Sequence, residues 1–440
     1  MKALLATLFW GVMAVAIFVL LARNTMAIPV LAPLDPNEGW NAAHALSLLA
    51  GHSLYPPPQS LMVNNYPPLS FYLAAALTHV TGDAVIAGRI LSLFAFLGTC
   101  AGIALVMRRL VLSTHAQWVA VLFFAATLLI ASDYVGMDDP QLLGHAVQLF
   151  ALLLLTRERP LAGGAAFAAS LFLKHNLLVL PLAAAFWLWR RRPGAALRFV
   201  LSGIGFIALG LMLFRLFYGV DLLSMLASPR LTSLANVQSA ASHLWWAVLP
   251  LAALLLQRQD PRRDFCLIYA AIALAVGLIF SAGDGVDMNV FFDLAIACAL
   301  ALGLAAETNS ARAALCALPL PLFLMANFQG NNFFFTPDFR SQSARDIAFL
   351  KSHPGAALCD QLSLCLWAGK GAAVDVFNVD EQIKTGARDP SSLMRMIAAH
   401  HFAVLQLQDL DALGAVRGTI ESHYRADHSD DNGTFFTPSF

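Results

Sequence analysis

The sequence predicts an α-helical polytopic membrane protein with a small C-terminal α/β soluble domain, on the evidence of its composition and its charge placement. Of the 440 residues, 59% are hydrophobic and only 12% are charged, and the mean hydropathy is +0.68. Charged residues make up about a quarter of an average soluble domain, so this composition excludes a soluble globular enzyme. The 27 basic residues balance the 27 acidic residues, which leaves no basic surface for nucleic acid.

The charges divide the chain into two predicted domains. Residues 329–440 hold 22 of the charged residues, whereas residues 1–328 carry long apolar runs. We therefore expect a transmembrane domain over 1–328 and a soluble domain over 329–440. The apolar runs are continuous rather than alternating, which favours helices over a transmembrane β-barrel.

Eleven apolar runs are predicted transmembrane helices, and several are shorter than the ~20 residues that cross a bilayer upright. Residues 161–189 could form a broken pair of helices or a re-entrant feature. Counting the run at 66–82 would invert every later loop, so we interpret it as a helix in the outer interface. The predicted spans are 3–21, 84–107, 116–132, 140–155, 161–174, 177–189, 197–217, 244–257, 264–281, 288–305 and 312–328.

The loops set the orientation through the positive-inside rule. With a cytoplasmic N-terminus, the inner loops collect thirteen basic residues, among them Arg190, Arg191 and Arg192, whereas the outer half keeps five. Eleven spans then place residues 329–440 outside, which is the periplasmic side of a bacterial inner membrane. The first run also resembles a cleavable signal, but its length favours a retained anchor.

The long first outer loop, 22–83, carries two carboxylates shortly after the first span. The segment Asp35-Pro36-Asn37-Glu38 is typical of a helix start, with acidic side chains near the positive end of the helix dipole. Asp35 can act as the helix cap, as a catalytic base, or as both. We treat Asp35 and Glu38 as candidate catalytic residues.

Two adjacent carboxylates, Asp138 and Asp139, separate the third and fourth spans. Such a pair at a membrane boundary can hold a divalent cation or a metal-bound pyrophosphate. The sequence indicates no cofactor beyond this candidate cation. The alternative is a solvated loop in which one Asp caps the helix that begins near Pro140.

Lys174 and His175 interrupt the apolar stretch 161–188 at its outer side. An ionisable residue at such a depth is a functional candidate by default, and Lys commonly binds phosphate. The alternative is that the Lys174 ammonium extends to the lipid headgroups.

Asp287, Asn289 and Asp293 lie at the start of the tenth span. Asn289 and Asp293 are four residues apart, so they would share one face of a helix. Asp293 needs a partner or a wet cavity at this depth. The alternative to a substrate role is a structural ion pair with Arg89 or Arg215.

Motifs of several other enzyme classes are missing from the sequence. It contains no HExxH, CxxC or GxxxxGK[ST], which argues against a zincin, a thioredoxin-like redox site and a P-loop pump. Cys359 and Cys365 lie in the predicted outer domain. In an oxidising compartment they could form a short-loop disulfide, and a free pair is the alternative.

Several short motifs follow one another in a fixed order on the predicted outer side. They are Asp35-x-x-Glu38-Gly39, Ala50-Gly51, Leu54-Tyr55, Asn65-Tyr66-Pro67-Pro68-Leu69, Gly88-Arg89, Asp138-Asp139-Pro140, Lys174 to Pro181, and Gly285-Val286-Asp287-Met288-Asn289 with Asp293. Together they resemble the GT-C glycosyltransferases, in particular the bacterial protein-mannosyltransferase-like, ArnT-like and Rgt-like group. The resemblance covers nearly the whole chain. The family often has adjacent Asp-Glu, whereas the acids here are three apart, which leaves open which one is the base.

The resemblance implies a hexosyl- or pentosyltransferase of GT-C type. It would move a sugar from a polyprenyl-phosphate donor to a glycan, lipid or protein acceptor at the outer face of the bilayer. The soluble tail also resembles that of these enzymes, and its sequence predicts a small α/β unit with helices at 341–352 and 391–399 and strands at 356–361, 372–377 and 401–408. The resemblance further implies catalysis by Asp35 and Glu38, donor-phosphate binding by Lys174, Arg89 and His175, and substrate binding by Asn65, Tyr66, Asp138, Asp139, Asp287, Asn289 and Asp293.

The chemistry requires a base and a cation on the same side of the membrane. An acceptor hydroxyl must lose its proton as it attacks the anomeric carbon, and a carboxylate in reach can take that proton. The resemblance implies Asp35 rather than Glu38 as this base, because the distance from Asp35 to Gly51 better matches the spacing of the base in that family. A secondary transporter, or a binding or assembly protein without transferase activity, is the alternative. A transporter would usually show paired repeat halves, and the sequence shows no internal repeat.

Overall fold

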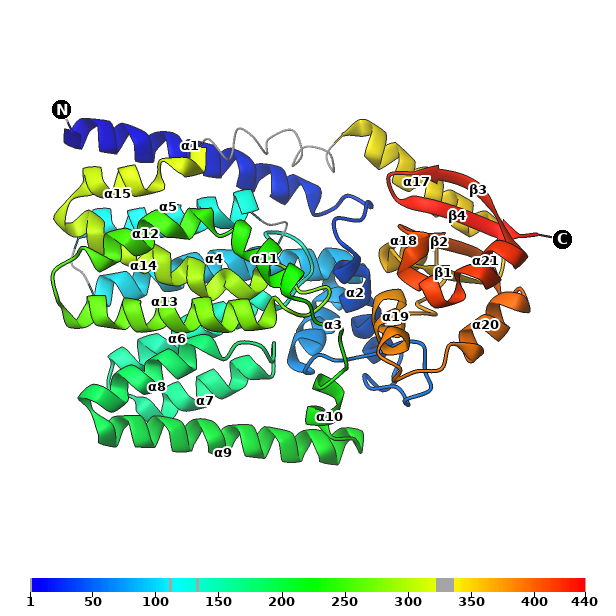
Figure 1. Ribbon diagram of the computed structural model, residues 1–440, viewed down its shortest axis with the longest axis horizontal. Helices are drawn as coiled ribbons and strands as arrows, with labels where there is room; N and C mark the ends of the chain where they lie inside the picture. The colour runs from blue at the N-terminus through cyan, green and yellow to red at the C-terminus, as the bar shows by residue number, and fades with distance from the viewer. Residues whose placement is uncertain (1, 111–112, 132–133, 322–335, 440) are drawn as a thin grey trace.

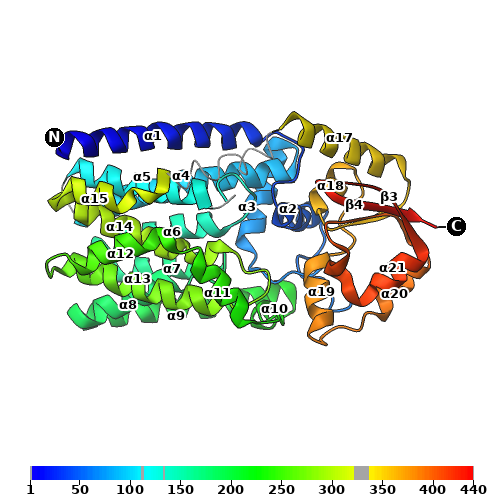
Figure 2. The ribbon, with the colours of Figure 1, turned by 45° about the horizontal axis from the view of Figure 1, so that its top comes forward.

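A helical bundle and a smaller α/β domain make up the structure, which is a computed structural model that describes residues 2–110, 113–131, 134–321 and 336–439 (Figure 1). The helices of the bundle run side by side, and the α/β domain lies at one end of them. The first outer loop, with helices α2 (Pro36–Leu49) and α3 (Leu69–Thr81), lies between these two parts in both views (Figures 1 and 2).

Ten of the eleven predicted spans coincide with helices. The eleventh, 312–328, overlaps α15 and then continues outside the described residues, as does the predicted domain boundary at residue 328. Within the described residues, five helices of at least 18 residues are long and apolar enough to cross a bilayer, and shorter apolar helices accompany them. The bundle contains α1 (Lys2–Ala27), α4 (Ala84–Leu110), α5 (Thr114–Ala131), α6 (Gln141–Thr156), α7 (Pro160–Leu171), α8 (Val179–Arg191), α9 (Pro193–Tyr218), α12 (Trp245–Leu255), α13 (Pro261–Phe280), α14 (Phe292–Thr308) and α15 (Ser310–Ala317).

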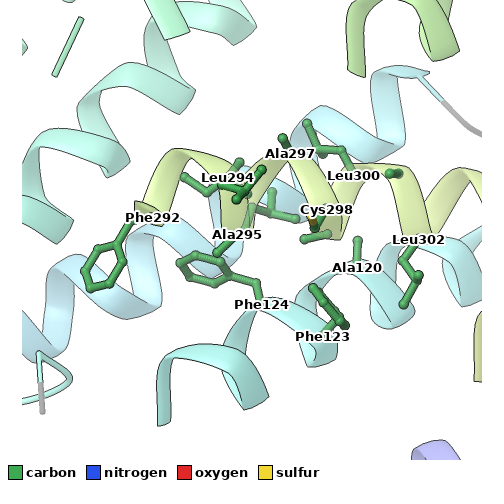
Figure 3. Close-up of a cluster of buried hydrophobic side chains, with 14 of the residues drawn as sticks. Ala120, Phe123, Phe124, Phe292, Leu294, Ala295, Ala297, Cys298, Leu300 and Leu302 are labelled. Atoms are coloured by element: carbon green, nitrogen blue, oxygen red, sulfur yellow. The ribbon is translucent and has the colours of Figure 1, made fainter. Parts of the chain in front are cut away.

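Helix α14 is the centre of the bundle. In the most apolar 18-residue stretch of the segment that contains this helix, 89% is buried inside the protein, and the helix packs against α5, α12 and α13. A helix that is apolar all round belongs in a core, and the small residues Ala295, Ala297 and Cys298 let α5 approach closely through Phe123 and Phe124 (Figure 3). Helix α9 is the opposite case. Only 11% of its most apolar 18-residue stretch is buried within the protein, and most of its apolar surface is therefore left to face lipid.

The break predicted inside 161–189 is confirmed. Helix α7 ends at Leu171 and α8 begins at Val179, so Lys174 lies in the connection between two short helices. The helix predicted at 66–82 is α3, which follows the proline pair Pro67-Pro68 and ends at Gly82 in the left-handed conformation that glycine adopts without strain. The remaining outer segments are α10 (Leu222–Leu226), α11 (Leu234–Ser242) and the 3-10 helix η1 (Met288–Phe291).

The C-terminal domain is a four-stranded mixed sheet with helices on both faces. The strand order is β1-β2-β4-β3, with β1 parallel to β2 and the other neighbours antiparallel. One apolar cluster joins the sheet to α17 and α18, and another joins it to α19, α20 and α21. The elements are α17 (Pro337–Ser352), β1 (Ala356–Cys359), α18 (Leu362–Trp367), α19 (Val376–Lys384), α20 (Ser391–Ala398), β2 (Phe402–Leu407), η3 (Leu410–Val416), α21 (Arg417–His423), β3 (Tyr424–Asp430) and β4 (Gly433–Pro438).

This domain differs from the prediction in one assigned strand and in several elements that were not predicted. The strand predicted at 372–377 is wrong: Asp375 instead caps α19, and its backbone N–H donates to the carbonyl of Leu61 in the first outer loop. The hairpin formed by β3 and β4 was not predicted. The structure contains the predicted disulfide between Cys359 and Cys365, whose Cα atoms are 6.0 Å apart.

The C-terminal domain docks directly on α2. Gly39 of α2 lies against the backbone of Leu362 and Ser363 at the start of α18, and any side chain at position 39 would overlap that backbone. This contact explains why a glycine follows Glu38 in the Glu-Gly motif. The predicted catalytic helix is therefore held between the helical bundle and the C-terminal domain.

Candidate functional site

Asp35 is the half-buried cap of α2. Its backbone is extended, and its Oδ1 accepts a hydrogen bond of 2.8 Å from the N–H of Asn37. The pKa of Asp35 is raised to about 7, chiefly by burial; the hydrogen bond from Asn37 opposes this rise, and the negative charges of Glu38, Asp287 and Asp139 contribute to it. The capping role is therefore real, and it leaves Oδ2 for another partner.

Glu38 has a different environment from Asp35 although it lies one turn away. Its side chain is fully buried and forms a two-pronged ion pair with Arg89 of α4, with both N–H···O distances at 2.7 Å. The same carboxylate accepts from the backbone N–H groups of Leu34 and Asp138. Glu38 thus ties together the entry to α2, helix α4 and the loop before α6.

The Arg89 guanidinium likewise has all of its N–H groups in hydrogen bonds. Its guanidinium donates to Glu38 and to the carbonyls of Ala27, Ile28, Val30 and Ala32, and the side chain is completely buried. A phosphate would find no unused N–H on this group. The predicted role of Arg89 in donor-phosphate binding therefore does not fit the structure, and we assign Arg89 to holding the turn that follows α1.

Glu38→Gln is expected to lower stability rather than turnover alone. The change leaves the Arg89 charge buried without a counter-ion, and breaking such a pair costs about 3–5 kcal/mol. Thermal unfolding of the purified protein in detergent checks this, with Asp35→Asn as the matched control because an amide oxygen can still cap α2. A Glu38→Gln protein as stable as wild type would contradict the assigned role.

Asp138 is packed against Gly88, where any larger residue on α4 would overlap its carboxyl group. Burial raises the pKa of Asp138 well above its usual range, with Glu38 and Asp139 adding to the effect and Arg89 opposing it. Its backbone carbonyl accepts from Asn41 of α2 at 2.8 Å. The adjoining cavity, lined in part by Asn41 and Asp138, has about 10 Å³, which is room for about one water and not for a sugar.

Asp139 points its two oxygens at different partners. Oδ1 accepts from the N–H of Gln141 at the start of α6, and Oδ2 accepts from the Lys174 ammonium at 2.8 Å. Because Asp139 is engaged in this way and Asp138 is packed against Gly88, the structure gives no support to a divalent cation at this pair. The candidate cation stays a prediction, and no step below depends on it.

Lys174 does not extend to the headgroups. Its side chain is only 3% exposed, and the ammonium donates to Asp139 and to the Tyr66 hydroxyl, 2.9 Å away. The same nitrogen is 4.2 Å from the centre of the Tyr66 ring. The sequence therefore identified a buried cation, and the structure supplies its carboxylate and aromatic partners.

Two other predicted site residues of this region, His175 and Asn65, have different surroundings. The His175 ring packs edge-on against Tyr66, and its Nδ1 has no hydrogen-bond partner within the described residues. Asn65, in contrast, donates to Asn378 of the C-terminal domain at 3.1 Å. Asn65 thus belongs to the contact between domains.

The three predicted site residues near the tenth span, Asp287, Asn289 and Asp293, also lie in different environments. Asp287 is exposed and caps η1, and its charge contributes to the raised pKa of Asp35. Asn289 lies in η1 and Asp293 in α14, so the two do not sit on one continuous α-helix. Asp293 is buried in the bundle and accepts from the Tyr269 hydroxyl at 2.6 Å; the ion pair proposed with Arg89 or Arg215 is wrong.

A group of potential metal ligands lies elsewhere, in the C-terminal sheet. Asp346, His428 and Asp430 place one ligand atom each within 4.8 Å of one another. These atoms are already engaged, because Asp346 accepts from Asn432 and His428, and Asp430 accepts from the N–H of Asn432. The group explains how the β3–β4 turn is fastened to α17, and it is separate from the carboxylates of the first outer loop.

Two site neighbours were missed by the sequence. Trp40 of α2 packs edge-on against Tyr66, with ring centres 4.8 Å apart, and its indole N–H donates to Asp375 at 2.8 Å. The four-residue spacing of Trp40 and His44 is the only local signal, and it predicts a shared helix face without naming the partner. Asp375 carries no local signal, because its partner lies 335 residues away in the sequence.

No protein-family model matches the chain, and no curated protein matches its sequence. Solved structures do match its fold. A crystal structure of ArnT from Cupriavidus metallidurans bound to undecaprenyl phosphate aligns with a TM-score of 0.60, and one of the same protein in the apo state with 0.59. Each is 13% identical in sequence, and each alignment covers 98% of this chain and 97% of that chain.

The similarity therefore extends over both the bundle and the C-terminal domain. The chain has an ArnT-like fold, and it is a multi-pass membrane protein with a small C-terminal domain, as the sequence predicts.

Proposed function

We propose that the protein is an integral membrane glycosyltransferase that moves a hexosyl or pentosyl group from a polyprenyl-phosphate donor to a glycan, lipid or protein acceptor at the outer membrane face. One observation carries the proposal: the half-buried carboxylate of Asp35 interacts electrostatically with Asp139, and Asp139 is the ion-pair partner of the buried cation Lys174. The fold adds support, because the ArnT structure of the same fold binds undecaprenyl phosphate.

Asp35 is the proposed general base. Its Oδ2 takes the proton of the acceptor hydroxyl while the hydroxyl oxygen forms a bond to the anomeric carbon. The bond from that carbon to the phosphate oxygen breaks, and the polyprenyl phosphate leaves with the electron pair. Direct displacement of this kind inverts the anomeric centre. A base whose pKa is near the working pH is both available and strong enough for this task.

Lys174 is the proposed electrostatic partner of the leaving phosphate. A fixed cation in a water-poor site stabilises charge that develops in the transition state. In the structure the ammonium is paired with Asp139, so a bound phosphate would share the cation with Asp139 or replace it. Tyr66 and His175 border this position and would contact the phosphate or the sugar.

The pH dependence of turnover follows from Asp35. Because its pKa lies near 7 in place of the usual 3.8, the carboxylate form is a minor species at pH 6 and becomes the major one above pH 7. We expect kcat to rise with pH through about 7 and then to level off. Initial transfer rates measured from pH 5.5 to pH 8.5 check this, and a rate that is flat over that range would exclude Asp35 as the titrating base.

We also propose that the N-terminus is cytoplasmic and that residues 329–440 are extracytoplasmic. The positive-inside count and the disulfide support this orientation, because disulfides persist in oxidising compartments. Mass spectrometry of peptides from intact membranes, with thiols blocked before any reduction, should find Cys359 and Cys365 linked. If both thiols are alkylated without a reductant, the outer placement of the domain loses this support.

A transfer assay in membranes tests the activity itself. Membranes that contain the protein should pass a radiolabelled sugar from a polyprenyl-phosphate donor to an acceptor, and membranes with Asp35→Asn protein should not. A transporter would move the label across the membrane without a change in its chemical linkage. Equal transfer by both proteins would show that Asp35 is not the base of the observed reaction.

A further inference from the structure

The C-terminal domain reaches into the candidate site through one side of α19. Asp375, which caps α19, is buried and accepts both the Trp40 indole N–H and the Asn378 amide N–H at 2.8 Å. Asn378 is also buried, and its Oδ1 accepts from the Asn65 amide at 3.1 Å. Two side chains of the outer domain are therefore bonded to two residues of the first outer loop and α2.

Both of these contacts lead to Tyr66. Asn65 precedes Tyr66 in the chain, so its bond to Asn378 fixes the backbone that carries the tyrosine. The Trp40 ring lies edge-on against the Tyr66 ring and is held in place by Asp375. The tyrosine is thus supported from two sides by groups that are themselves anchored in the outer domain.

Tyr66 in turn is a direct partner of Lys174. Its hydroxyl accepts from the ammonium at 2.9 Å, and its ring borders the same nitrogen at 4.2 Å. A continuous chain of contacts therefore runs from α19 of the outer domain through Tyr66 to the buried cation.

We propose that Asp375 and Asn378 are positioning residues, through which the C-terminal domain fixes Tyr66 and thereby sets where Lys174 presents its charge to a lipid phosphate. The inference rests on the proposed function of Lys174. Functional groups must be held to within about half an ångström by supporting contacts, and a loosely supported group loses much of its effect. The domain is then part of the donor site, although it contributes no group that touches the phosphate.

The docking of the domain does not depend on these two residues alone. Arg388 donates to the carbonyls of Pro58 and Ser60, and the Trp367 indole donates to Asp83. The loss of one amide in Asn378→Ala should therefore leave the domain in place. Arg388→Ala is a matched control, because it removes an interdomain contact without touching Tyr66, Asn65 or Trp40.

The test measures the affinity of the purified full chain, in lipid nanodiscs, for undecaprenyl phosphate. We expect Asn378→Ala to weaken binding roughly tenfold, a size typical of coupled residues, and Arg388→Ala to bind as wild type does. In a Tyr66→Phe background, Asn378→Ala should add little further loss, because Asn378 acts through the position of Tyr66. Fully additive losses, or equal losses for Asn378→Ala and Arg388→Ala, would overturn the inference.

The same experiment separates this inference from the proposed function. If Lys174→Met weakens binding and Asn378→Ala does not, the positioning role is wrong and the role of Lys174 stands. If Lys174→Met binds undecaprenyl phosphate as wild type does, the proposed function of the site is wrong. Should Asn378→Ala fail to fold, Asn65→Ala removes the same hydrogen bond from its other end and must produce the same tenfold loss.

Discussion

Lys174→Met is expected to reduce affinity for undecaprenyl phosphate by roughly 10- to 100-fold, the range expected when a charged hydrogen bond is lost. The ammonium is the buried cation beside Tyr66 and Asp139, and methionine keeps most of the volume while it removes the charge. Sugar transfer should fall at least as far, because the charge on the leaving phosphate increases in the transition state. Equilibrium binding of undecaprenyl phosphate to the purified protein measures the effect.

The variant needs a control for folding, since Lys174→Met strands the buried Asp139 carboxylate. The double variant Lys174→Met/Asp139→Asn removes both charges, which is often close to neutral for stability. The asparagine Oδ1 can still accept from the Gln141 N–H, so the start of α6 is kept. We expect the double variant to unfold near the wild-type temperature and still to lose phosphate affinity. If it binds undecaprenyl phosphate normally, Lys174 is a structural residue.

Asp35→Asn is expected to lower kcat by a hundredfold or more, the usual size of a general-base contribution. The amide is nearly the same shape and still caps α2 through its oxygen, but it cannot take a proton. Affinity for undecaprenyl phosphate should stay close to wild type, because Asp35 is proposed to contact the acceptor and not the phosphate. Steady-state rates at saturating donor, together with donor binding, separate these two quantities.

The contrast between the two carboxylates sharpens this expectation. Asp35→Asn should leave unfolding unchanged and remove turnover, whereas Glu38→Gln should lower stability through the loss of its pair with Arg89. A stable Glu38→Gln protein without activity, beside an active Asp35→Asn protein, would reverse the two roles. The sequence left open whether Asp35 or Glu38 is the base, and measurements of stability and turnover on the two variants distinguish between them.

Local patterns predicted the parts of this protein that depend on neighbouring residues. The apolar runs located the helices, and the charged interruption at Lys174 located the break between α7 and α8. The segment from Asp35 to Glu38 predicted the start of α2, since a cap and an acidic first turn are properties of a few adjacent residues. The fold class also followed, because hydropathy and charge are sums over the chain.

Partners across the chain could not be predicted in the same way. The sequence placed both Glu38 and Arg89 at the site, but it did not pair them with each other. Their ion pair joins residues 51 positions apart and gives both a structural role in place of the predicted catalytic and phosphate-binding roles. An arginine partner was the structural alternative for Asp293, and the structure gives it the Tyr269 hydroxyl instead. The supposed strand at 372–377 is a capped helix start, because Asp375 finds its partner on α2. In each case the deciding contact is created by the packing of distant segments.

The central claim is that Asp35 and Lys174 together release a polyprenyl phosphate from a lipid-linked sugar. The most direct measurement follows the appearance of undecaprenyl phosphate from a panel of pentosyl and hexosyl undecaprenyl phosphates, with purified wild-type, Asp35→Asn and Lys174→Met proteins and a mixed pool of acceptors. We predict acceptor-dependent release by the wild-type protein from at least one donor, and at least a hundredfold slower release by Asp35→Asn. Release at the wild-type rate by both variants, or no release by the wild-type protein from any donor of the panel, would contradict the claim.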